Sequence, residues 1–326
     1  MCTRVVYTGD DQRVITARSM DWAERMGTEI WLFPRGMERH GAAGPASCEW
    51  KSRYGSVVTS AYDSVSTDGL NEAGLVANML WLTESQYPVL DGSAPTLSLA
   101  AWAQYVLDSF STVAEAVAAL EAEPFVVRTA DVPGQDRSTT LHMSISDETG
   151  DSAIFEYLDG RLQIHHSAAY SVMTNSPPYA EQLSISTYWE QLGGDVMLPG
   201  TGRASDRFVR AKYYTDSAVP MPDAPTAAAA ALAIIRNVSV PFREPNIDSP
   251  YLSSTHWRTM ADHKDRRYYF DSAYSPSVVW VDLQSVDVTE GSGARRLGLS
   301  QSTASAGDLT DKLEAAEPFE FAPVTY

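Results

Sequence analysis

The stretch that decides the fold stands at the start of the chain and reads MCTRVVYTGDDQRVITARSMDW, residues 1–22. Two short runs rich in β-branched residues, TRVVYTG and RVITARSMDW, flank the polar turn GDDQ, and this pattern predicts a β-hairpin. The hairpin places Cys2 at the start of its first strand. It also returns Arg18 and Asp21 close to Cys2.

The rest of the chain continues as alternating strand-rich and helix-rich stretches. Strands are expected in residues 29–36, 54–62, 69–82, 139–167 and 266–283, and helices in residues 96–110, 112–123, 205–218 and 226–239. Thr112 and Glu115 form a capping box for the second helix. The order β, α, β, α, β predicts an α+β protein with helices outside packed sheets. No linker divides residues 1–326, so we expect a single catalytic domain.

Composition and charge narrow the classes of partner. The chain has 24 basic and 42 acidic residues, a net charge of −18, which disfavours nucleic acid and anionic lipid. No apolar run is long enough for a transmembrane helix, and residues 1–11 lack the features of a signal peptide. The compartment is left open: periplasmic if the chain was trimmed to a mature start, and cytoplasmic otherwise.

Metal and cofactor chemistry find little support in the sequence. Only two cysteines, Cys2 and Cys48, are present, and the adjacent His165 and His166 would point to opposite faces of a strand. Neither a glycine-rich phosphate loop nor a G-x-S-x-G motif occurs. We therefore expect no metal and no cofactor.

Cys2 is the candidate nucleophile. Removal of Met1 would place an α-amine, with a pKa of about 8, on the same residue as a thiol with a pKa of about 8.5, so one residue could act as base and nucleophile. Arg18 would favour the thiolate, and Asp21 could orient the ammonium. Two simpler interpretations stay open: position 2 merely tolerates a cysteine, and Arg18 and Asp21 form a structural ion pair.

Five motifs, taken together and in this order, indicate a family: MCTRVV (1–6), ARSMDW (17–22), NEAGL (71–75), MTNSP (173–177) and SDRFVRA (205–211). With these motifs the chain resembles the choloylglycine hydrolase family, which includes conjugated bile salt hydrolases and penicillin V acylases. The resemblance implies a four-layered αββα N-terminal nucleophile hydrolase fold, cleavage of a small-molecule amide, and a homotetramer.

The resemblance also implies roles for individual residues. Cys2 matches the nucleophile, and Trp81 stands where the family supplies a backbone N–H to the oxyanion. Asn175 matches the side-chain donor to the same oxyanion. The supporting charged positions are Arg18, Asp21 and Arg207.

Trp22 and Trp81 bear on the substrate. They resemble the Gram-negative branch of the family, which contains penicillin V acylases and acyl-homoserine lactone acylases, and two indoles would suit a phenoxyacetyl ring or an acyl chain. We expect cleavage of the penicillin V side-chain amide, and of acyl-homoserine lactones, through a thioester. The alternatives are bile salt hydrolysis, a non-catalytic binding module on the same fold, and tryptophans that only fill the core.

Overall fold

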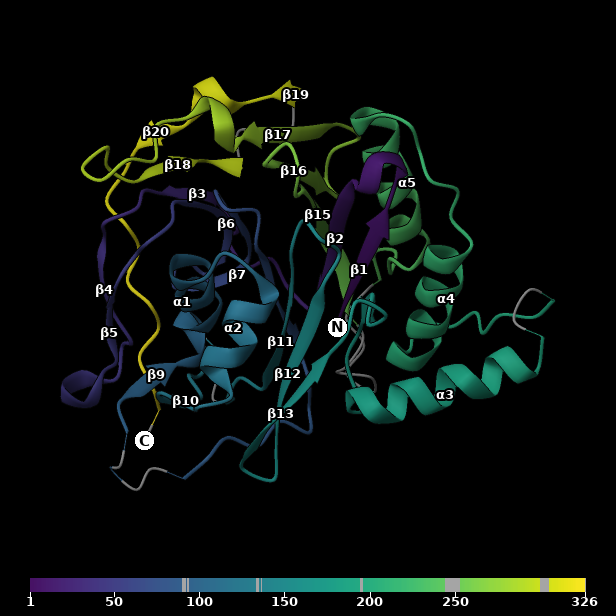
Figure 1. Ribbon diagram of the computed structural model, residues 1–326, viewed down its shortest axis with the longest axis horizontal. Coiled ribbons are helices and arrows are strands. Elements are labelled where there is room, and N and C mark those ends of the chain that lie inside the picture. The colour runs from purple at the N-terminus through teal and green to yellow at the C-terminus, as the bar shows by residue number, and fades with distance from the viewer. Residues whose placement is uncertain are drawn as a thin grey trace.

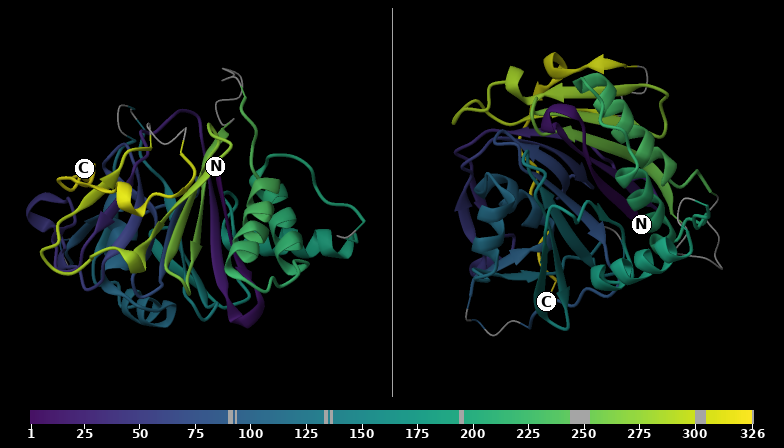
Figure 2. Two further views of the ribbon diagram at one scale, coloured as in Figure 1. Left: turned by 90° about the horizontal axis from the view of Figure 1, so that it is seen from above. Right: turned by 45° about the vertical axis from the view of Figure 1, so that its right-hand side comes forward.

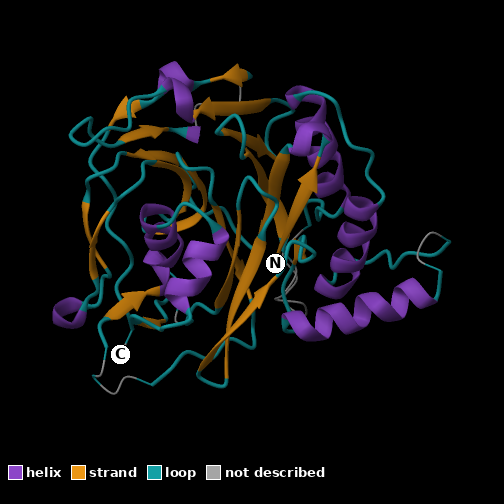
Figure 3. Cartoon of the chain, in the orientation of Figure 1, coloured by secondary structure: helices purple, strands orange, loops and turns teal. Residues whose placement is uncertain are grey.

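Two large β-sheets stacked face to face form the centre of the molecule, with helices on both outer sides (Figures 1 and 3). The computed structural model describes residues 1–89, 92, 94–132, 135, 137–193, 196–243, 253–299 and 305–325. Strands of both sheets contribute to one hydrophobic cluster, which includes Val5, Leu70, Leu80 and Val281. The α+β, four-layered αββα prediction is confirmed.

The first sheet carries the amino terminus. Its strand order is β14-β1-β2-β15-β16-β17-β19, antiparallel apart from the parallel β17–β19 pair. The bounds are β1 Cys2–Thr8, β2 Val14–Trp22, β14 Val172–Met173, β15 Ser254–Asp262, β16 Arg267–Ser272, β17 Val278–Asp282 and β19 Gly307–Asp308. The predicted hairpin is therefore β1–β2, and β1 lies between β2 and β14.

The second sheet has the order β13-β12-β11-β8-β7-β6-β3-β18-β20. Its bounds are β3 Ile30–Phe33, β6 Ser56–Ala61, β7 Val65–Asn71, β8 Val76–Trp81, β11 Leu141–Ser146, β12 Ser152–Leu158, β13 Arg161–His166, β18 Arg295–Leu297 and β20 Glu314–Ala315. Two small strand pairs lie apart: β4 Glu38–His40 with β5 Glu49–Lys51, and β9 Thr96–Ser98 with β10 Val126–Arg128.

Helices form the outer layers. Helices α1 (Trp102–Ser109) and α2 (Val113–Leu120) pack on the second sheet, whereas α4 (Ala204–Asp216) and α5 (Ala224–Asn237) pack on β1 and β2, and α3 (Tyr179–Gln191) packs on α4. The view from above in Figure 2 shows α3–α5, in green, outside the strands. In Figure 1 the amino terminus lies near the middle of the view, and Cys2, the first residue of β1, is buried. No described helix has the length and apolar character of a membrane span.

Three details differ from the sequence-based expectations. The helix expected over residues 96–110 begins only at Trp102, because Thr96–Ser98 pairs with Val126–Arg128 as a parallel strand and the Ser98 Oγ then accepts the Ala100 N–H of a short 3-10 turn. Two elements were not predicted from the sequence: helix α3, in which only Tyr179, Gln182 and Ser186 are buried, and strand β15. The single-domain organisation stays a prediction, testable as one cooperative unfolding transition.

Candidate active site

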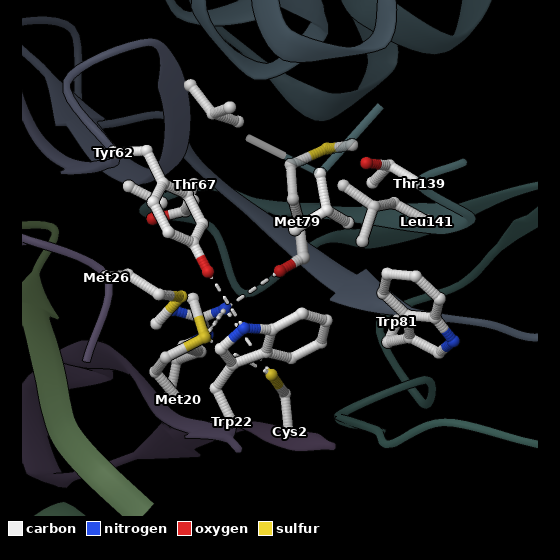
Figure 4. Close-up of a pocket in the computed structure, with 14 residues that line it drawn as sticks. Cys2, Met20, Trp22, Met26, Tyr62, Thr67, Met79, Trp81, Thr139 and Leu141 are labelled. Atoms are coloured by element: carbon white, nitrogen blue, oxygen red, sulfur yellow. Dashed lines mark hydrogen bonds between the residues drawn. The ribbon is translucent and has the colours of Figure 1, made fainter. Parts of the chain in front are cut away.

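The side chain of Cys2 faces the space between the two sheets. Cys2 pairs with Met20 across the hairpin, and because strand side chains alternate, Arg18, Met20 and Trp22 share its face. Thr3 and Asp21 lie on the opposite face, toward the helices. Figure 4 shows the sulfur side, where Arg18 Nη2 lies 3.5 Å from Cys2 Sγ and donates to the Met79 carbonyl at 2.9 Å. The alternative of an Arg18–Asp21 ion pair is wrong, since the pleat separates the two side chains.

Arg18 lies next to an aromatic ring and a buried carboxyl group. Its guanidinium carbon lies 4.6 Å from the centre of the Trp257 ring. The buried carboxyl of Asp68 accepts from the Tyr268 hydroxyl and from Asn78 Nδ2. Burial raises the pKa of Asp68, and the positive charge of Arg18 acts in the opposite direction. The Trp257 ring and the Met79 carbonyl therefore position Arg18 beside the sulfur, and Arg18 forms no ion pair with the residues that the structure describes.

The backbone of Cys2 is held from the other side by Asn175 and Arg207. Cys2 N donates to Asn175 Oδ1 at 2.7 Å, and Arg207 Nη2 donates to the same oxygen at 2.7 Å. Arg207 Nη1 donates to the Cys2 carbonyl at 2.6 Å and to Thr3 Oγ1 at 2.5 Å. Burial lowers the pKa of Arg207, whereas Asp21 raises it. These contacts fix the position of the Cys2 nitrogen.

The two carboxylate oxygens of Asp21 differ in their contacts. Thr255 Oγ1 donates to Asp21 Oδ1 at 2.6 Å, while Oδ2 has no hydrogen-bond partner within the described ranges and lies 3.8 Å from Arg207 Nη1. In this chain Met1 precedes Cys2, and its ammonium donates to the Asp21 carbonyl at 2.5 Å. Burial is the main cause that lowers the pKa of the Met1 amino group. The lowered pKa leaves a larger share of this Met1 amine unprotonated near neutral pH.

The backbone of Trp81 faces Asn175. Asn175 Nδ2 donates to the Trp81 carbonyl at 2.7 Å. The Leu82 N–H donates to the Thr140 carbonyl, so Trp81, one residue earlier in the antiparallel pairing, directs its N–H and its carbonyl away from β11. Its N–H thus points to the same side as the carbonyl that Asn175 contacts.

The indoles of Trp22 and Trp81 stand together at the edge of this site. Their ring centres lie 5.2 Å apart with a 45° angle between the planes. Trp22 Nε1 donates to the Tyr62 hydroxyl at 3.0 Å, which in turn donates to Glu24. The pair forms part of the wall of a largely apolar cavity of about 530 Å³ between the sheets, into which Cys2 and Arg18 also face (Figure 4).

A second, more polar cavity of about 1130 Å³ lies on the other side of the tryptophan pair. Trp22 and Trp81 line both cavities. Cys2 lines the apolar one, whereas Met1 and Asn175 line the polar one. The Cys2 side chain therefore faces the apolar cavity, and Asn175, which accepts a hydrogen bond from the Cys2 nitrogen, lines the polar one.

The structure brings together all seven residues expected from the sequence and adds others that reasoning from sequence missed. Thr255 reaches Asp21 because a bulge in β15 sets Thr255 opposite Asp21 and Trp257 opposite Met20. Thr3, whose hydroxyl accepts a hydrogen bond from Arg207, lies inside the MCTRVV motif, so the sequence did carry a signal for this residue. Tyr62 gave no signal in the sequence. His165 and His166 do face different partners, Glu156 and Asp151.

Comparisons with known proteins place the chain in a family of amide hydrolases. Residues 2–294 match the family of linear amide C-N hydrolases called the choloylglycine hydrolase family. The penicillin V acylase of Pectobacterium atrosepticum is 50% identical, over 98% of this chain and 92% of that protein. The solved penicillin V acylase of Agrobacterium tumefaciens is 50% identical, covers 99% of this chain and 100% of its own, and superposes with a TM-score of 0.91.

More distant relatives share the fold. A bile salt hydrolase/transferase of Bifidobacterium longum subsp. longum is 25% identical over 65% of this chain and 73% of that protein. The solved conjugated bile acid hydrolase of Clostridium perfringens is 20% identical, covers 91% of this chain and 96% of its own, and has a TM-score of 0.77. The matched sequence and the two-sheet architecture lead to one conclusion: the chain belongs to the choloylglycine hydrolase family and is a non-peptide amide hydrolase with an N-terminal nucleophile hydrolase fold.

Proposed function

We propose that the chain, once Met1 is removed, hydrolyses the side-chain amide of penicillin V and also cleaves acyl-homoserine lactones, with Cys2 as the nucleophile. One observation carries the proposal. Cys2 Sγ faces an apolar cavity lined by two indoles, and the Cys2 nitrogen donates a hydrogen bond to Asn175 Oδ1. The acylases that are 50% identical over nearly the whole chain support the choice of penicillin V.

The acyl group occupies the apolar cavity. A phenoxyacetyl ring or an acyl chain gains from burial against Trp22 and Trp81, because apolar contact area is the main source of such binding. Bile salt hydrolysis would use the same chemistry on a steroid acyl group, so substrate comparison separates the two.

In the first step, the Cys2 thiol transfers its proton to its own α-amine and the sulfur attacks the amide carbon. The negative charge that develops on the carbonyl oxygen is stabilised by Asn175 Nδ2 and the Trp81 N–H, which point to the same side of β8. Arg18, 3.5 Å from the sulfur, stabilises the thiolate.

In the second step, the ammonium of Cys2 returns its proton to the leaving amine, the C–N bond breaks, and a thioester remains. Water, deprotonated by the same amine, then hydrolyses the thioester and regenerates the thiol. Asp21 Oδ2, which accepts no hydrogen bond from the residues that the structure describes, accepts from the ammonium during this cycle and keeps it oriented. The reaction consumes one water per amide and uses no metal or cofactor.

The test begins with the mass of the intact purified protein, which shows whether Met1 has been removed. The processed enzyme is then assayed with penicillin V, an acyl-homoserine lactone and a glycine-conjugated bile salt. We expect cleavage of the first two and slow cleavage of the third. Dominant bile salt turnover would replace the proposed substrate class.

Two further results bear on the rest of the proposal. A processed enzyme that binds these amides but cleaves none would support the non-catalytic binding module instead. The homotetramer that the resemblance implies also stays a proposal, and light scattering on the purified protein tests it.

A further inference from the structure

Two buried polar side chains hold the loop that carries Asn175, and the proposed reaction steps use neither of them. The loop joins β14 to α3. His142, on β11, has its Nε2 at 3.1 Å from the Thr174 carbonyl oxygen. Gln182, on α3, donates from Nε2 to the Asn175 carbonyl at 2.7 Å and to the Pro177 carbonyl at 3.1 Å. Side chains from neighbouring elements therefore bond to three backbone carbonyls of this loop.

These contacts fix the backbone on both sides of the Asn175 Cα atom. The Thr174 carbonyl belongs to the peptide plane before this atom, and the Asn175 carbonyl belongs to the plane after it. A peptide bond is planar, so holding the two planes sets φ and ψ of Asn175 and with them the direction of its side chain. Nδ2 of that side chain is the proposed oxyanion donor, so its position depends on the two contacts.

Glu156 orients His142 and determines its protonation. Glu156 Oε1 lies 2.8 Å from His142 Nδ1, and the carboxylate also accepts the N–H of Tyr179 at 3.0 Å. Burial alone would raise the pKa of Glu156, but the rings of His142 and His165 outweigh burial and bring that pKa to about 2. An ionised carboxylate and a carbonyl both act only as acceptors, so both ring nitrogens of His142 donate and the ring is an imidazolium. A charged donor therefore holds the Thr174 carbonyl.

Helix α3 begins at the same carboxylate. Its N-cap residue, Pro178, makes no side-chain hydrogen bond, so Glu156 supplies the acceptor for the N–H of Tyr179 and a negative charge at the positive end of the helix dipole. Gln182 follows three residues after Tyr179 on this helix. The second sheet, through Glu156, thereby sets the position of both contacts to the loop.

We propose that His142 and Gln182 are positioning residues for the amide hydrolysis, which keep Asn175 Nδ2 directed at the carbonyl oxygen that gains negative charge. The inference rests on the proposed function. Neither residue is among the described residues that line the two cavities, so both act through Asn175 and not on the substrate. An oxyanion donor is effective at about 2.7–3.1 Å from the charged oxygen, so a small shift of the loop lowers turnover without weakening substrate binding.

The experiment begins with Gln182→Met, which keeps the size of the side chain, removes both N–H groups and leaves the Glu156 ion pair in place. In the processed enzyme, kcat for penicillin V should fall by about tenfold with KM within about twofold of wild type. Gln191→Met, at an exposed position at the other end of α3, is the matched control and should change neither value. His142→Leu should also lower kcat, whereas His142→Gln, which keeps an N–H that can reach the Thr174 carbonyl, should retain most of it.

Two readouts separate positioning from a merely structural role. Added to Asn175→Ala, Gln182→Met should lower kcat by no more than about twofold further, because the group that it positions is already gone. Alkylation of Cys2 by iodoacetamide forms no oxyanion, so in a Cys48→Ser background Gln182→Met should leave its rate unchanged. A further loss of about tenfold in the Asn175→Ala enzyme, or alkylation that slows in parallel with kcat, would overturn the inference.

An aldehyde tests the inference independently of turnover. Phenoxyacetaldehyde adds reversibly to Cys2: the S–C bond forms, the thiol proton passes to the α-amine, and the former carbonyl oxygen carries the charge that Asn175 meets. Its dissociation constant should rise by about tenfold in Gln182→Met and stay unchanged in Gln191→Met. If the wild type binds the aldehyde but cleaves no amide, the proposed function fails, and weaker binding in Gln182→Met would still support the positioning role. Equal affinities of wild type and Gln182→Met would overturn it.

Discussion

The two faces of the β1–β2 hairpin differ in the chemistry they support. On the face toward the second sheet, Cys2 Sγ, Arg18 and Trp22 border an apolar cavity of about 530 Å³. On the face toward the helices, Asp21, Thr3 and Arg207 form a buried polar network around the Cys2 backbone. One residue at the strand start therefore contributes its sulfur to the first environment and its nitrogen to the second.

This division shows how a single residue could supply both the proposed nucleophile and the proposed base. A sulfur surrounded by apolar groups needs a cation, which Arg18 supplies, to stabilise its thiolate. A nitrogen held among hydrogen-bonding groups needs oriented acceptors, which Asn175 supplies and Asp21 could. The four predictions that follow test this contrast, from the largest expected effect to the smallest.

Replacing the sulfur should have the largest effect. Cys2→Ser keeps the α-amine and the strand pairing but provides a much poorer nucleophile, so we expect kcat to fall by at least about 10³-fold with the thermal stability unchanged. Cys48→Ser, at the other, half-buried free cysteine, is the matched control and should keep full activity. Equal activities of Cys2→Ser and wild type would remove the proposed mechanism.

Asn175 connects the two faces, because it accepts from the Cys2 nitrogen and donates toward Trp81. Asn175→Ala should lower kcat by about 10² to 10³-fold, as expected for loss of one oxyanion donor. Asn175→Asp separates the two roles, since it keeps the acceptor for Cys2 and Arg207 but loses the N–H donor. A comparable loss in Asn175→Asp is expected, whereas near-normal turnover would assign Asn175 a role in holding the backbone only.

His263, which contacts Thr16 of β2, should affect the stability of the fold and not the activity. His263 Nδ1 donates to the Gly74 carbonyl at 2.7 Å, and Nε2 lies 2.8 Å from the Thr16 hydroxyl. Burial lowers the pKa of His263 to about 4 from an ordinary value of 6.5. The folded state therefore favours the neutral ring, and the stability this provides is full above pH 6.5 and is lost as the pH falls toward 4.

The loss over that pH range should amount to about 3 kcal/mol, and urea unfolding at pH 7 and pH 4.5 measures most of it. His263→Gln should flatten this dependence. His166→Gln, at a partly exposed position paired with Asp151, is the control that should leave it in place. A wild-type protein whose stability does not fall between these pH values would contradict the assignment of a neutral buried His263.

The smallest effect is expected at Tyr62, which supports the apolar wall. Tyr62→Phe removes the acceptor of the Trp22 indole N–H, a single hydrogen bond of about 1 kcal/mol. We expect KM for an aromatic acyl substrate to rise by roughly threefold to fivefold with kcat nearly unchanged. Tyr188→Phe, at an exposed tyrosine on α3, should change neither value. A fall in kcat instead would show that Tyr62 contributes to the reaction itself and does more than support the cavity wall.

Local patterns predicted much of the fold. The β1–β2 hairpin, the strands at Ile30–Phe33 and Ser56–Ala61, and α4 and α5 all follow from runs of β-branched residues or from helical periodicity. The cap of α2 was also correct: Thr112 Oγ1 accepts the Glu115 N–H. The Glu115 carboxylate, however, accepts the Ser111 N–H instead of that of Thr112.

The failures share a physical cause. Helix α3 buries too few side chains to show an apolar stripe, so its sequence carries no helical signal. Strand β15 is buried on both faces and mixes Thr, His, Trp and Arg, so it shows no alternation. Neither element is specified by its own residues; each is specified by the surfaces that cover it.

By itself, the sequence determined which residues are proposed as reacting groups, because a cysteine after Met1, an ordered set of motifs and the strand alternation around Arg18 and Asp21 are all local properties. Only the tertiary structure decided which group each of them meets. Asn175 and Arg207 stand 173 and 205 residues from Cys2, and Arg137 stands near Trp81 through chain folding alone. Contacts between such distant residues depend on how sheets and helices pack, and packing is a property of the whole chain rather than of any one segment.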